Sequence, residues 1–210
     1  MKRFETIVLV GILLFAGMFV FGCSKAETSA AGVASNYFPH EDGYSWKYID
    51  QNDSATISTI EGTTTINGNT VQIIKSSYPS SSSLSTDKGN ILGAFTSTGT
   101  SYWRVTDDAL YVYSSTSDTN PYMSLAFPLE IGKTWTIVEY EGYSLTAKVV
   151  ANENVTVPAG TFNCYKVDSF SHYGTEEAYM QSLWIGDRAG LVRGERSGGT
   201  YTTELEWKNF

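Results

Sequence analysis

One phrase occurs twice in this sequence, and the repetition limits the folds that the chain can adopt. The stretch "YFPHEDGYSWKYIDQ" begins at residue 37, and "AFPLEIGKTWTIVEY" begins at residue 126. At an offset of 89 positions five residues are identical: Phe38, Pro39, Glu41, Gly43 and Trp46 match Phe127, Pro128, Glu130, Gly132 and Trp135. Because five identities at one offset rarely arise by chance, we expect two copies of one structural unit.

Two further blocks are repeated in the same order. The stretch "TINGNTVQIIKSS" from residue 65 aligns with "TVPAGTFNCYKVD" from residue 156, and "YWRVTDDALYVY" from residue 102 aligns with "LWIGDRAGLVRG" from residue 183. The offsets are 91 and 81, so the first copy carries extra residues between these blocks, in the Ser-rich stretch "SSYPSSSSLSTDKGN". Residues 158–160 fit a three-residue hairpin loop with a left-handed Gly160, and the alignment puts Asn69 at the same position.

Within the blocks, apolar and polar residues alternate, as in β-strands that bury one face. Tyr44, Trp46 and Tyr48 form one such series, and no stretch of the chain after residue 22 shows a helical apolar stripe. The sequence therefore predicts an all-β fold of two tandem β-meander repeats, residues 37–117 and 118–210. Since a meander has one apolar face to bury, we expect one antiparallel sandwich, barrel or half-barrel. Two small domains with a hinge in the polar stretch "SSTSDTN" are the alternative.

Residues 1–22 have the layout of a secretory signal. Lys2 and Arg3 are followed by an uncharged apolar run that ends at Gly22 and Cys23. A small residue directly before Cys resembles the lipobox of bacterial lipoproteins, in which a peptidase cuts before the Cys and its sulfur receives a diacylglycerol. We therefore predict a lipoprotein signal peptide and lipidation of Cys23. An uncleaved transmembrane anchor is the alternative, because the run approaches the roughly 20 residues that span a bilayer.

Residues 23–36 are small and polar, which predicts a lipidated N-terminus followed by a flexible tether. Acyl chains such as palmitate would anchor the protein to a membrane outside the cytoplasm. Ser24 follows the Cys. Under the sorting rule of Gram-negative lipoproteins, a residue other than Asp at this position implies the outer membrane if the cell has two membranes.

The charge of the chain argues against some classes of partner, and its cysteine content argues against stabilisation by a disulfide. The formal net charge is −8, and an acidic protein is repelled by nucleic acid and by anionic headgroups. We therefore expect no nucleic-acid partner and expect attachment to the membrane through the N-terminal lipid. Cys164 is the only cysteine besides Cys23, so no intramolecular disulfide is available to the lipidated protein.

Residues that commonly carry catalysis are few. The histidines are His40 and His172, and for each a surface or structural role is favoured over catalysis. Cys164 aligns with Ile73 in an alternating strand, which favours a buried packing role over a nucleophile. The sequence predicts no catalytic residue, no metal site and no cofactor.

Carboxylates that only the fold brings together are the exception to this prediction. Glu176, Glu177 and Asp187 could meet in a cleft and form the acid pair of a hydrolase. Read individually, these residues are typical of solvated surface charge and of a turn.

Aromatic residues are the positive indication of a ligand. The chain has 5 Trp and 14 Tyr. The alignment places Trp46 over Trp135 and Trp103 over Trp184, as expected for the core of duplicated units. The candidate ligand-binding residues are Tyr111, Tyr113, Tyr122, Tyr140, Tyr143, Tyr201 and Trp207. Tyr and Trp line apolar clefts and stack on sugars, although core packing is the alternative role.

The blocks "FPLEIGKTW", "VTVPAGTFNCYKV" and "WIGDRAGLVRGE" resemble phrases that recur in a family of uncharacterised secreted or lipid-anchored bacterial proteins. The resemblance covers most of the second copy and, less closely, the first. It implies a shared fold and no particular activity. The curved sheets of the lipoprotein chaperones LolA and LolB are an analogy at the level of the fold only.

Together these observations favour a membrane-anchored lipoprotein outside the cytoplasm, with a non-catalytic β body that binds an apolar or glycan ligand or an envelope protein. A hydrolase of envelope polymers with clustered carboxylates and a purely structural envelope component are the alternatives. A cavity lined by aromatic groups would favour binding, whereas two inward carboxylates about 5 to 10 Å apart would favour hydrolysis.

Overall fold

The computed structural model describes residues 37–38, 40–78 and 91–210, and their regular structure is almost entirely β. The strands are β1 (Ser45–Asp50), β2 (Ala55–Ile66), β3 (Asn69–Ser77), β4 (Gly99–Val105), β5 (Ala109–Tyr113), β6 (Tyr122–Ala126), β7 (Thr134–Tyr140), β8 (Tyr143–Val157), β9 (Gly160–Tyr173), β10 (Glu176–Gly186), β11 (Gly190–Arg196) and β12 (Thr202–Lys208). The helical elements are α2 (Ile91–Thr96) and the single 3-10 turn η1 (Ser197–Gly199). The predicted all-β class is confirmed.

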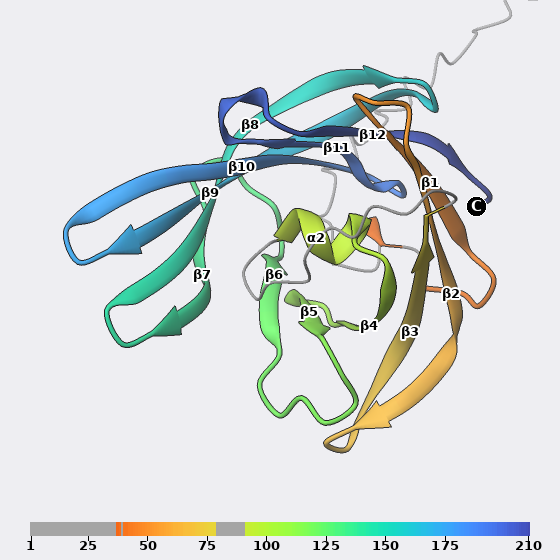
Figure 1. The fold of residues 1–210 in the computed structure, drawn as a ribbon, viewed down its shortest axis with the longest axis horizontal. Helices are drawn as coiled ribbons and strands as arrows, with labels where there is room; N and C mark the ends of the chain where they lie inside the picture. Colours follow the sequence, from red (N-terminus) through yellow and green to blue (C-terminus); the bar gives the residue numbers. More distant parts are fainter. Residues whose placement is uncertain (1–36, 39, 79–90) are drawn as a thin grey trace, which may run out of the picture. The chain divides into compact units, whose positions relative to one another are not determined.

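The strands form one 12-stranded antiparallel sheet, in which β1 to β6 and β7 to β12 are two successive meanders. The meanders join through the pair β1–β12, so β6 and β7 end the strand order. Figure 1 shows the sheet curling so that it nearly closes as a barrel. This confirms the prediction of one antiparallel, barrel-like body.

The two meanders pair their strands in the same register. At an offset of 91, Thr65–Thr70 and Ile66–Asn69 in β2–β3 correspond to Thr156–Thr161 and Val157–Gly160 in β8–β9. At an offset of 81, Trp103–Val112 in β4–β5 corresponds to Trp184–Arg193 in β10–β11. At an offset of 89, the bond from Gly43 N–H to Ile60 O (2.9 Å) corresponds to that from Gly132 N–H to Val149 O (2.8 Å). Strands with the same rank in the two meanders therefore have equivalent neighbours.

The β2–β3 turn is tighter than the predicted three-residue loop. Ile66 faces Asn69, so the turn consists of Asn67 and Gly68, with φ of 50° and 78°. Two successive left-handed residues make a type I′ turn, for which Asn-Gly is a preferred pair. The prediction of a left-handed Asn69 is therefore wrong, because Asn67 takes that conformation and Asn69 already belongs to β3. The three-residue loop predicted at residues 158–160 is also two residues long, because Val157 pairs with Gly160, which has a positive φ of 132° and begins β9.

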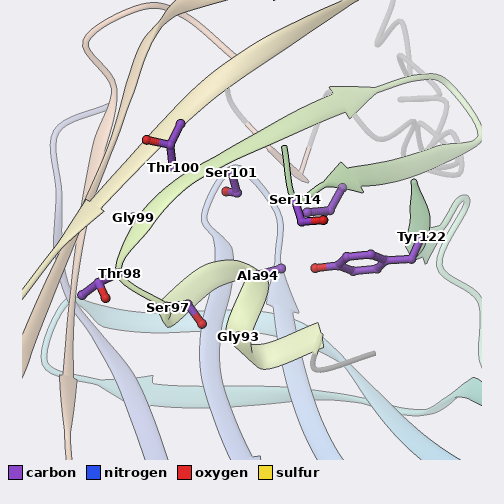
Figure 2. A pocket seen from close by; sticks show the side chains of 10 residues that line it. Gly93, Ala94, Ser97, Thr98, Gly99, Thr100, Ser101, Ser114 and Tyr122 are labelled. Carbon is purple, nitrogen blue, oxygen red and sulfur yellow. The ribbon is translucent and has the colours of Figure 1, made fainter. Parts of the chain in front are cut away.

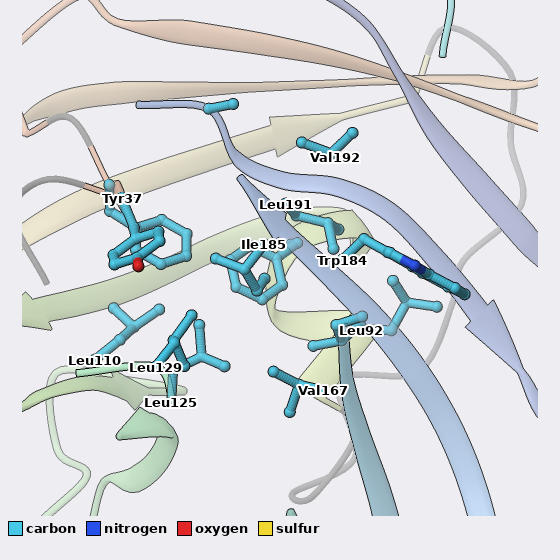
Figure 3. Close-up of a cluster of buried hydrophobic side chains, with 14 of the residues drawn as sticks. Tyr37, Leu92, Leu110, Leu125, Leu129, Val167, Trp184, Ile185, Leu191 and Val192 are labelled. Atoms are coloured by element: carbon cyan, nitrogen blue, oxygen red, sulfur yellow. The ribbon is translucent and has the colours of Figure 1, made fainter. Parts of the chain in front are cut away.

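Side chains from both meanders fill the inner face of the sheet (Figure 3). The four tryptophans that align in pairs are at most 9% exposed, which confirms their prediction as core residues: Trp46, Trp103, Trp135 and Trp184. The Phe38 ring lies 5.7 Å from that of Phe95, 6.0 Å from that of Trp103 and 6.3 Å from that of Phe127. Residues from before β1, from α2 and from between β6 and β7 thus meet in one aromatic core.

Helix α2 packs against the second meander. Leu92 is 1% exposed, and its side chain occupies the space that a Cβ on Gly194 of β11 would fill. The last turn of the helix is held by the Tyr78 hydroxyl, which donates to the carbonyl of Thr96 at 3.1 Å. These contacts fix the end of the helix and the segment that leads from it into β4.

Candidate functional site

A pocket lies where helix α2 ends and β4 begins, and β5 and β6 complete its wall (Figure 2). Its lining residues are Gly93, Ala94, Ser97, Thr98, Gly99, Thr100, Ser101, Val112, Ser114 and Tyr122. The cavity at its centre is about 40 Å³, so a ligand would enter it with one small group and lie mostly across the open mouth.

The lining of this pocket is uncharged and rich in hydroxyl groups. Hydroxyls are contributed by Ser97, Thr98, Thr100, Ser101, Ser114 and Tyr122. Gly93, Ala94 and Gly99 add no bulk, so a ligand can approach the backbone closely. Each hydroxyl can donate one hydrogen bond and accept others. The pocket therefore suits a neutral molecule that has an apolar surface and a few hydrogen-bonding groups.

Tyr122 supplies the aromatic ring among the lining residues. Figure 2 shows its hydroxyl directed toward α2. Burial raises the pKa of Tyr122 above its ordinary value, and the nearby carboxylate of Asp118 raises it further. The phenol therefore stays neutral at physiological pH. Of the seven aromatic residues predicted to bind a ligand, Tyr122 is the one that lines this pocket.

Asp118 organises the β5–β6 loop beside the pocket. Its carboxylate accepts hydrogen bonds from the N–H and the hydroxyl of Ser114 at 3.2 and 2.9 Å, and from the N–H of Asn120 at 3.1 Å. The side-chain amide of Asn67 donates to the carbonyl of Asp118 at 3.1 Å, which ties the loop to the β2–β3 turn. Because the Ser114 hydroxyl donates its proton to Asp118, Ser114 can act toward a ligand as a hydrogen-bond acceptor.

An open groove adjoins the pocket on the side of β2 and β3. It is lined by Ile57, Thr59, Glu61, Lys75, Ser76, Ser77, Gly99 and Thr100, and has a volume of about 330 Å³. The Lys75 ammonium lies 2.6 Å from the Glu61 carboxylate, and this hydrogen bond raises the pKa of Lys75. Gly99 and Thr100 line both spaces. The uncharged pocket therefore borders a groove with one exposed ion pair.

The other predicted ligand-binding residues are distributed over several strands. Tyr111 and Tyr113 are on β5, Tyr140 is on β7, Tyr143 is on β8, Tyr201 directly precedes β12 and Trp207 is on β12. Tyr113 is 2% exposed and packs with Ile66 and Val71 in a small second cluster. Tyr140 and Tyr143 face each other across the β7–β8 pair. The structure thus brings two pairs of the predicted residues together, Tyr140 with Tyr143 and Tyr111 with Tyr113, and does not gather all seven into one site.

The carboxylates considered for a hydrolase lie at opposite ends of β10. Glu176 and Glu177 begin this strand, and Asp187 follows its last residue. The ten residue steps from Glu177 to Asp187 correspond to roughly 33 Å of extended chain. The expectation that these acids meet in one cleft is therefore wrong, because the strand that carries them keeps them apart.

The other catalytic candidates have structural surroundings. The Nε2 atom of His172 lies 2.8 Å from the Thr146 hydroxyl, and its Nδ1 atom lies 3.6 Å from the Glu177 carboxylate. Cys164 is fully buried, which confirms its predicted packing role. Burial raises the pKa of the Cys164 thiol to about 12, and Glu153 contributes further. Within residues 37–38, 40–78 and 91–210, no three His, Cys, Asp or Glu side chains are grouped to hold a metal ion.

Most of the pocket was not predicted from the sequence. Helix α2 has six residues, fewer than two turns, so it leaves no apolar periodicity to detect. The stretch "GAFTSTGTS" from Gly93 does carry a signal, because small and hydroxyl residues are concentrated in it. Tyr122 lies on β6 and Ser114 directly follows β5, so their contribution to the pocket depends on the strand order.

The predicted signal peptide and Cys23 lie outside the described residues. In the described part of the chain, no helix has both the length and the apolar character that crossing a membrane requires.

Comparison with known proteins relates part of the chain to a sequence family and most of it to solved structures. A family model described as DUF3108-like matches residues 138–201. A Bacteroides fragilis protein, described as exported and as having a YmcC-like fold, is 14% identical, with a TM-score of 0.47 over 83% of this chain and 99% of its own. A Parabacteroides distasonis protein, described as a lipoprotein, is 14% identical, with a TM-score of 0.44 over 85% of this chain and 99% of its own. Among curated proteins, none matches significantly.

Proposed function

We propose that this protein is a lipid-anchored, extracytoplasmic binding protein whose pocket beside α2 takes a neutral saccharide. The observation that carries the proposal is the lining of the pocket, with six hydroxyl side chains and no charged one. An ionic ligand would lose its hydration there without gaining a charged partner, which is costly. A sugar offers hydroxyls that can exchange hydrogen bonds with those of the lining.

The shape of the pocket supports the same ligand class. The ring of Tyr122 lines the pocket and offers an apolar surface for the carbon-bound hydrogens of a sugar, and its neutral hydroxyl can donate a hydrogen bond. Gly93 and Gly99 allow close approach to the backbone. The groove with Glu61 and Lys75 at the mouth gives a longer chain of sugars room to continue.

The location in this proposal comes from the N-terminal sequence. A basic start, an apolar run and Gly22-Cys23 form the signal. Acyl chains on Cys23 would hold the body at the membrane surface through the tether of residues 24–36, in the outer membrane where the cell has two membranes. The envelope polymers of bacteria contain sugars, so this place would expose the pocket to its ligand class.

The proposal favours binding over catalysis. None of the ten lining residues is Asp, Glu, His, Lys or Cys, and Tyr122 is held in its neutral form. The acids considered for hydrolysis are separated along β10. A purely structural envelope component would not need a hydroxyl-lined pocket.

The matching registers of the two meanders also support an origin by duplication. The equivalent strands are β1 to β6 and β7 to β12, so the copies would divide between β6 and β7. We therefore assign β6 to the first copy, a few residues beyond the division predicted at residues 117 and 118. In this reading, the pocket is particular to the first copy, because α2 lies between its second and third blocks, where the second copy has only the β9–β10 hairpin.

The proposal is tested by calorimetric titration of the full-length protein in detergent with cellobiose, maltose and diacetylchitobiose. We expect binding of at least one, and weaker binding of glucose 6-phosphate, which carries charge. Ser101→Ala and Tyr122→Leu should each weaken binding about tenfold, whereas Ser144→Ala, a hydroxyl deletion on β8, should leave it unchanged. Absence of binding by all neutral sugars, or equal loss in Ser144→Ala, would contradict the saccharide assignment.

A further inference from the structure

Three tyrosines and one glutamate form a row across four neighbouring strands. The registers pair Tyr140 of β7 with Tyr143 of β8, Tyr143 with Tyr173 of β9, and Tyr173 with Glu176 of β10. Residues directly opposite each other in a sheet point to the same face and lie close together. These four side chains, the tyrosine row, therefore share one face at the ends of the strands. At about 4.8 Å per strand the row is roughly 14 Å long.

The tyrosine row is exposed, although aromatic residues are usually buried. Tyr140 is 52% exposed and Tyr173 is 73% exposed, whereas Tyr143 is partly buried against the main core. Met180, further along β10, is 42% exposed. Figure 1 shows the tips of the β7–β8 and β9–β10 hairpins projecting beyond the rest of the sheet, on the left of the view. Exposed apolar groups gathered in one place are typical of interaction surfaces.

The charge around the tyrosine row is negative. The two turns that flank it, residues 139–142 and 172–177, contain four carboxylates and no Lys or Arg: Glu139, Glu141, Glu176 and Glu177. All four are exposed. Apart from these carboxylates and the tyrosines, His172 is the one titratable group in the two turns. Its Nδ1 atom lies 3.6 Å from the Glu177 carboxylate. The surface therefore attracts a cationic partner and repels anionic ones.

Two tyrosines elsewhere in the chain have an arginine of the same chain over the ring. Arg104 lies over the ring of Tyr111 at 5.6 Å, and Arg196 lies over that of Tyr201 at 5.8 Å. In the described part of the chain, no such cation lies over Tyr140, Tyr143 or Tyr173. The row thus presents ring faces that can accept cations from another molecule.

The sheet edge beside the row favours an extended polypeptide over a small cation. β7 ends the strand order and, among the described residues, pairs with β8 alone. An edge strand offers backbone N–H and C=O groups to an added strand. Tyr140 is the last residue of this edge strand. A chain that pairs along β7 would therefore run directly beside the tyrosine row.

We propose that the tyrosine row and the edge of β7 bind an extended, lysine- or arginine-rich segment of a partner protein. The cations of that segment lie over the tyrosine rings and pair with the flanking carboxylates, and its backbone pairs with β7. This surface is separate from the pocket beside α2, so the inference does not rest on the saccharide assignment.

The test uses the full-length protein in detergent and a fluorescent decapeptide of alternating Lys and Thr. Fluorescence anisotropy at low salt should show saturable binding that weakens as salt is added, with no binding of the matching Glu–Thr decapeptide. Tyr173→Ala should weaken binding severalfold, and Tyr140→Ala with Tyr173→Ala should weaken it at least about tenfold. Both side chains are largely exposed, and circular dichroism checks that the variants fold.

Two double variants that remove the same charge distinguish binding at the tyrosine row from general attraction of a cationic peptide to an acidic protein. Glu141→Gln with Glu176→Gln should weaken binding about tenfold. Asp53→Asn with Glu130→Gln removes the same charge from exposed positions elsewhere and should leave binding unchanged, as should Tyr122→Leu in the pocket. Equal loss in both pairs, no binding of the Lys–Thr peptide, or loss of neutral-sugar binding in the tyrosine variants would overturn the proposal.

Discussion

Leu92 of helix α2 occupies the space beside Gly194 of β11 that any side chain at position 194 would need. The contact joins an element of the first meander to a strand of the second. It also sets the distance between α2 and the sheet, and thereby the position of Gly93, Ala94 and Ser97 in the pocket wall. A single missing Cβ on β11 therefore contributes to the geometry of a site built mainly from the first meander.

Gly194→Ala should displace α2 and destabilise the protein by about 1–3 kcal/mol, the usual cost of overpacking. Urea unfolding measures this loss. Leu92→Ala combined with Gly194→Ala should cost less than the sum of the single changes, because the smaller residue makes room for the added methyl. Strictly additive losses would show that the two side chains do not compete for the same space.

Glu153→Ala should destabilise the protein by about 1 kcal/mol, because the indole N–H of Trp184 donates to Glu153 at 2.6 Å and would lose its partner. The Trp184 ring is also flanked by Lys166 at 5.0 Å and Arg193 at 5.2 Å. Glu153→Gln keeps an acceptor and should lose less. Glu130→Ala, at an exposed position, serves as the control for removal of a carboxylate. Equal unfolding midpoints for Glu153→Ala and the control would contradict a role for this bond.

Cys164 should make the protein less stable as the pH rises from about 9 toward 12. Burial raises the pKa of its thiol from 9.0 to about 12. Above pH 9 the unfolded chain loses this proton while the folded chain keeps it. Deprotonation therefore stabilises the unfolded state and lowers the free energy of unfolding. Urea midpoints measured across this range should fall more steeply for the natural protein than for Cys164→Ala. Parallel curves would mean that the thiol titrates alike in both states.

Lipidation of Cys23 can be tested in cells. Cells that express the protein and are fed labelled palmitate should incorporate the label into the natural chain and not into Cys23→Ser. The natural chain should also be shorter by the mass of residues 1–22, apart from the added lipid. Labelling that persists in Cys23→Ser, or an intact N-terminus on the natural chain, would support an uncleaved anchor instead.

The sequence predicted the fold class because strand periodicity and the aligned tryptophans are local signals. Trp46 and Trp135 recur in register because each must fill the inner face at the start of a meander, and both are buried. The two-residue turns were missed, because a three-residue loop was predicted for both hairpins, whereas Asn67-Gly68 and Pro158-Ala159 each make a turn of two residues. A Pro cannot take the positive φ of Asn67, so equivalent turns need not share a conformation.

The sites were less predictable, because they depend on which strands become neighbours. Tyr140 and Tyr143 were expected to bind a ligand, but Tyr173, which completes their row, becomes visible only through the β8–β9 register. Tyr122 was expected for its aromatic ring, whereas its hydroxyl-bearing neighbours come from the α2–β4 segment. The separation of Glu177 from Asp187 likewise follows from the length of β10.

The most direct measurement is native mass spectrometry of the full-length protein, released gently from detergent, before and after incubation with neutral oligosaccharides. The account predicts a saccharide adduct at a ratio of one per chain, retained from the cell or formed on incubation, and lost in Tyr122→Leu with Ser101→Ala. A bare protein mass under both conditions, or an adduct that persists in that double variant, would contradict the claim that the pocket beside α2 binds sugar.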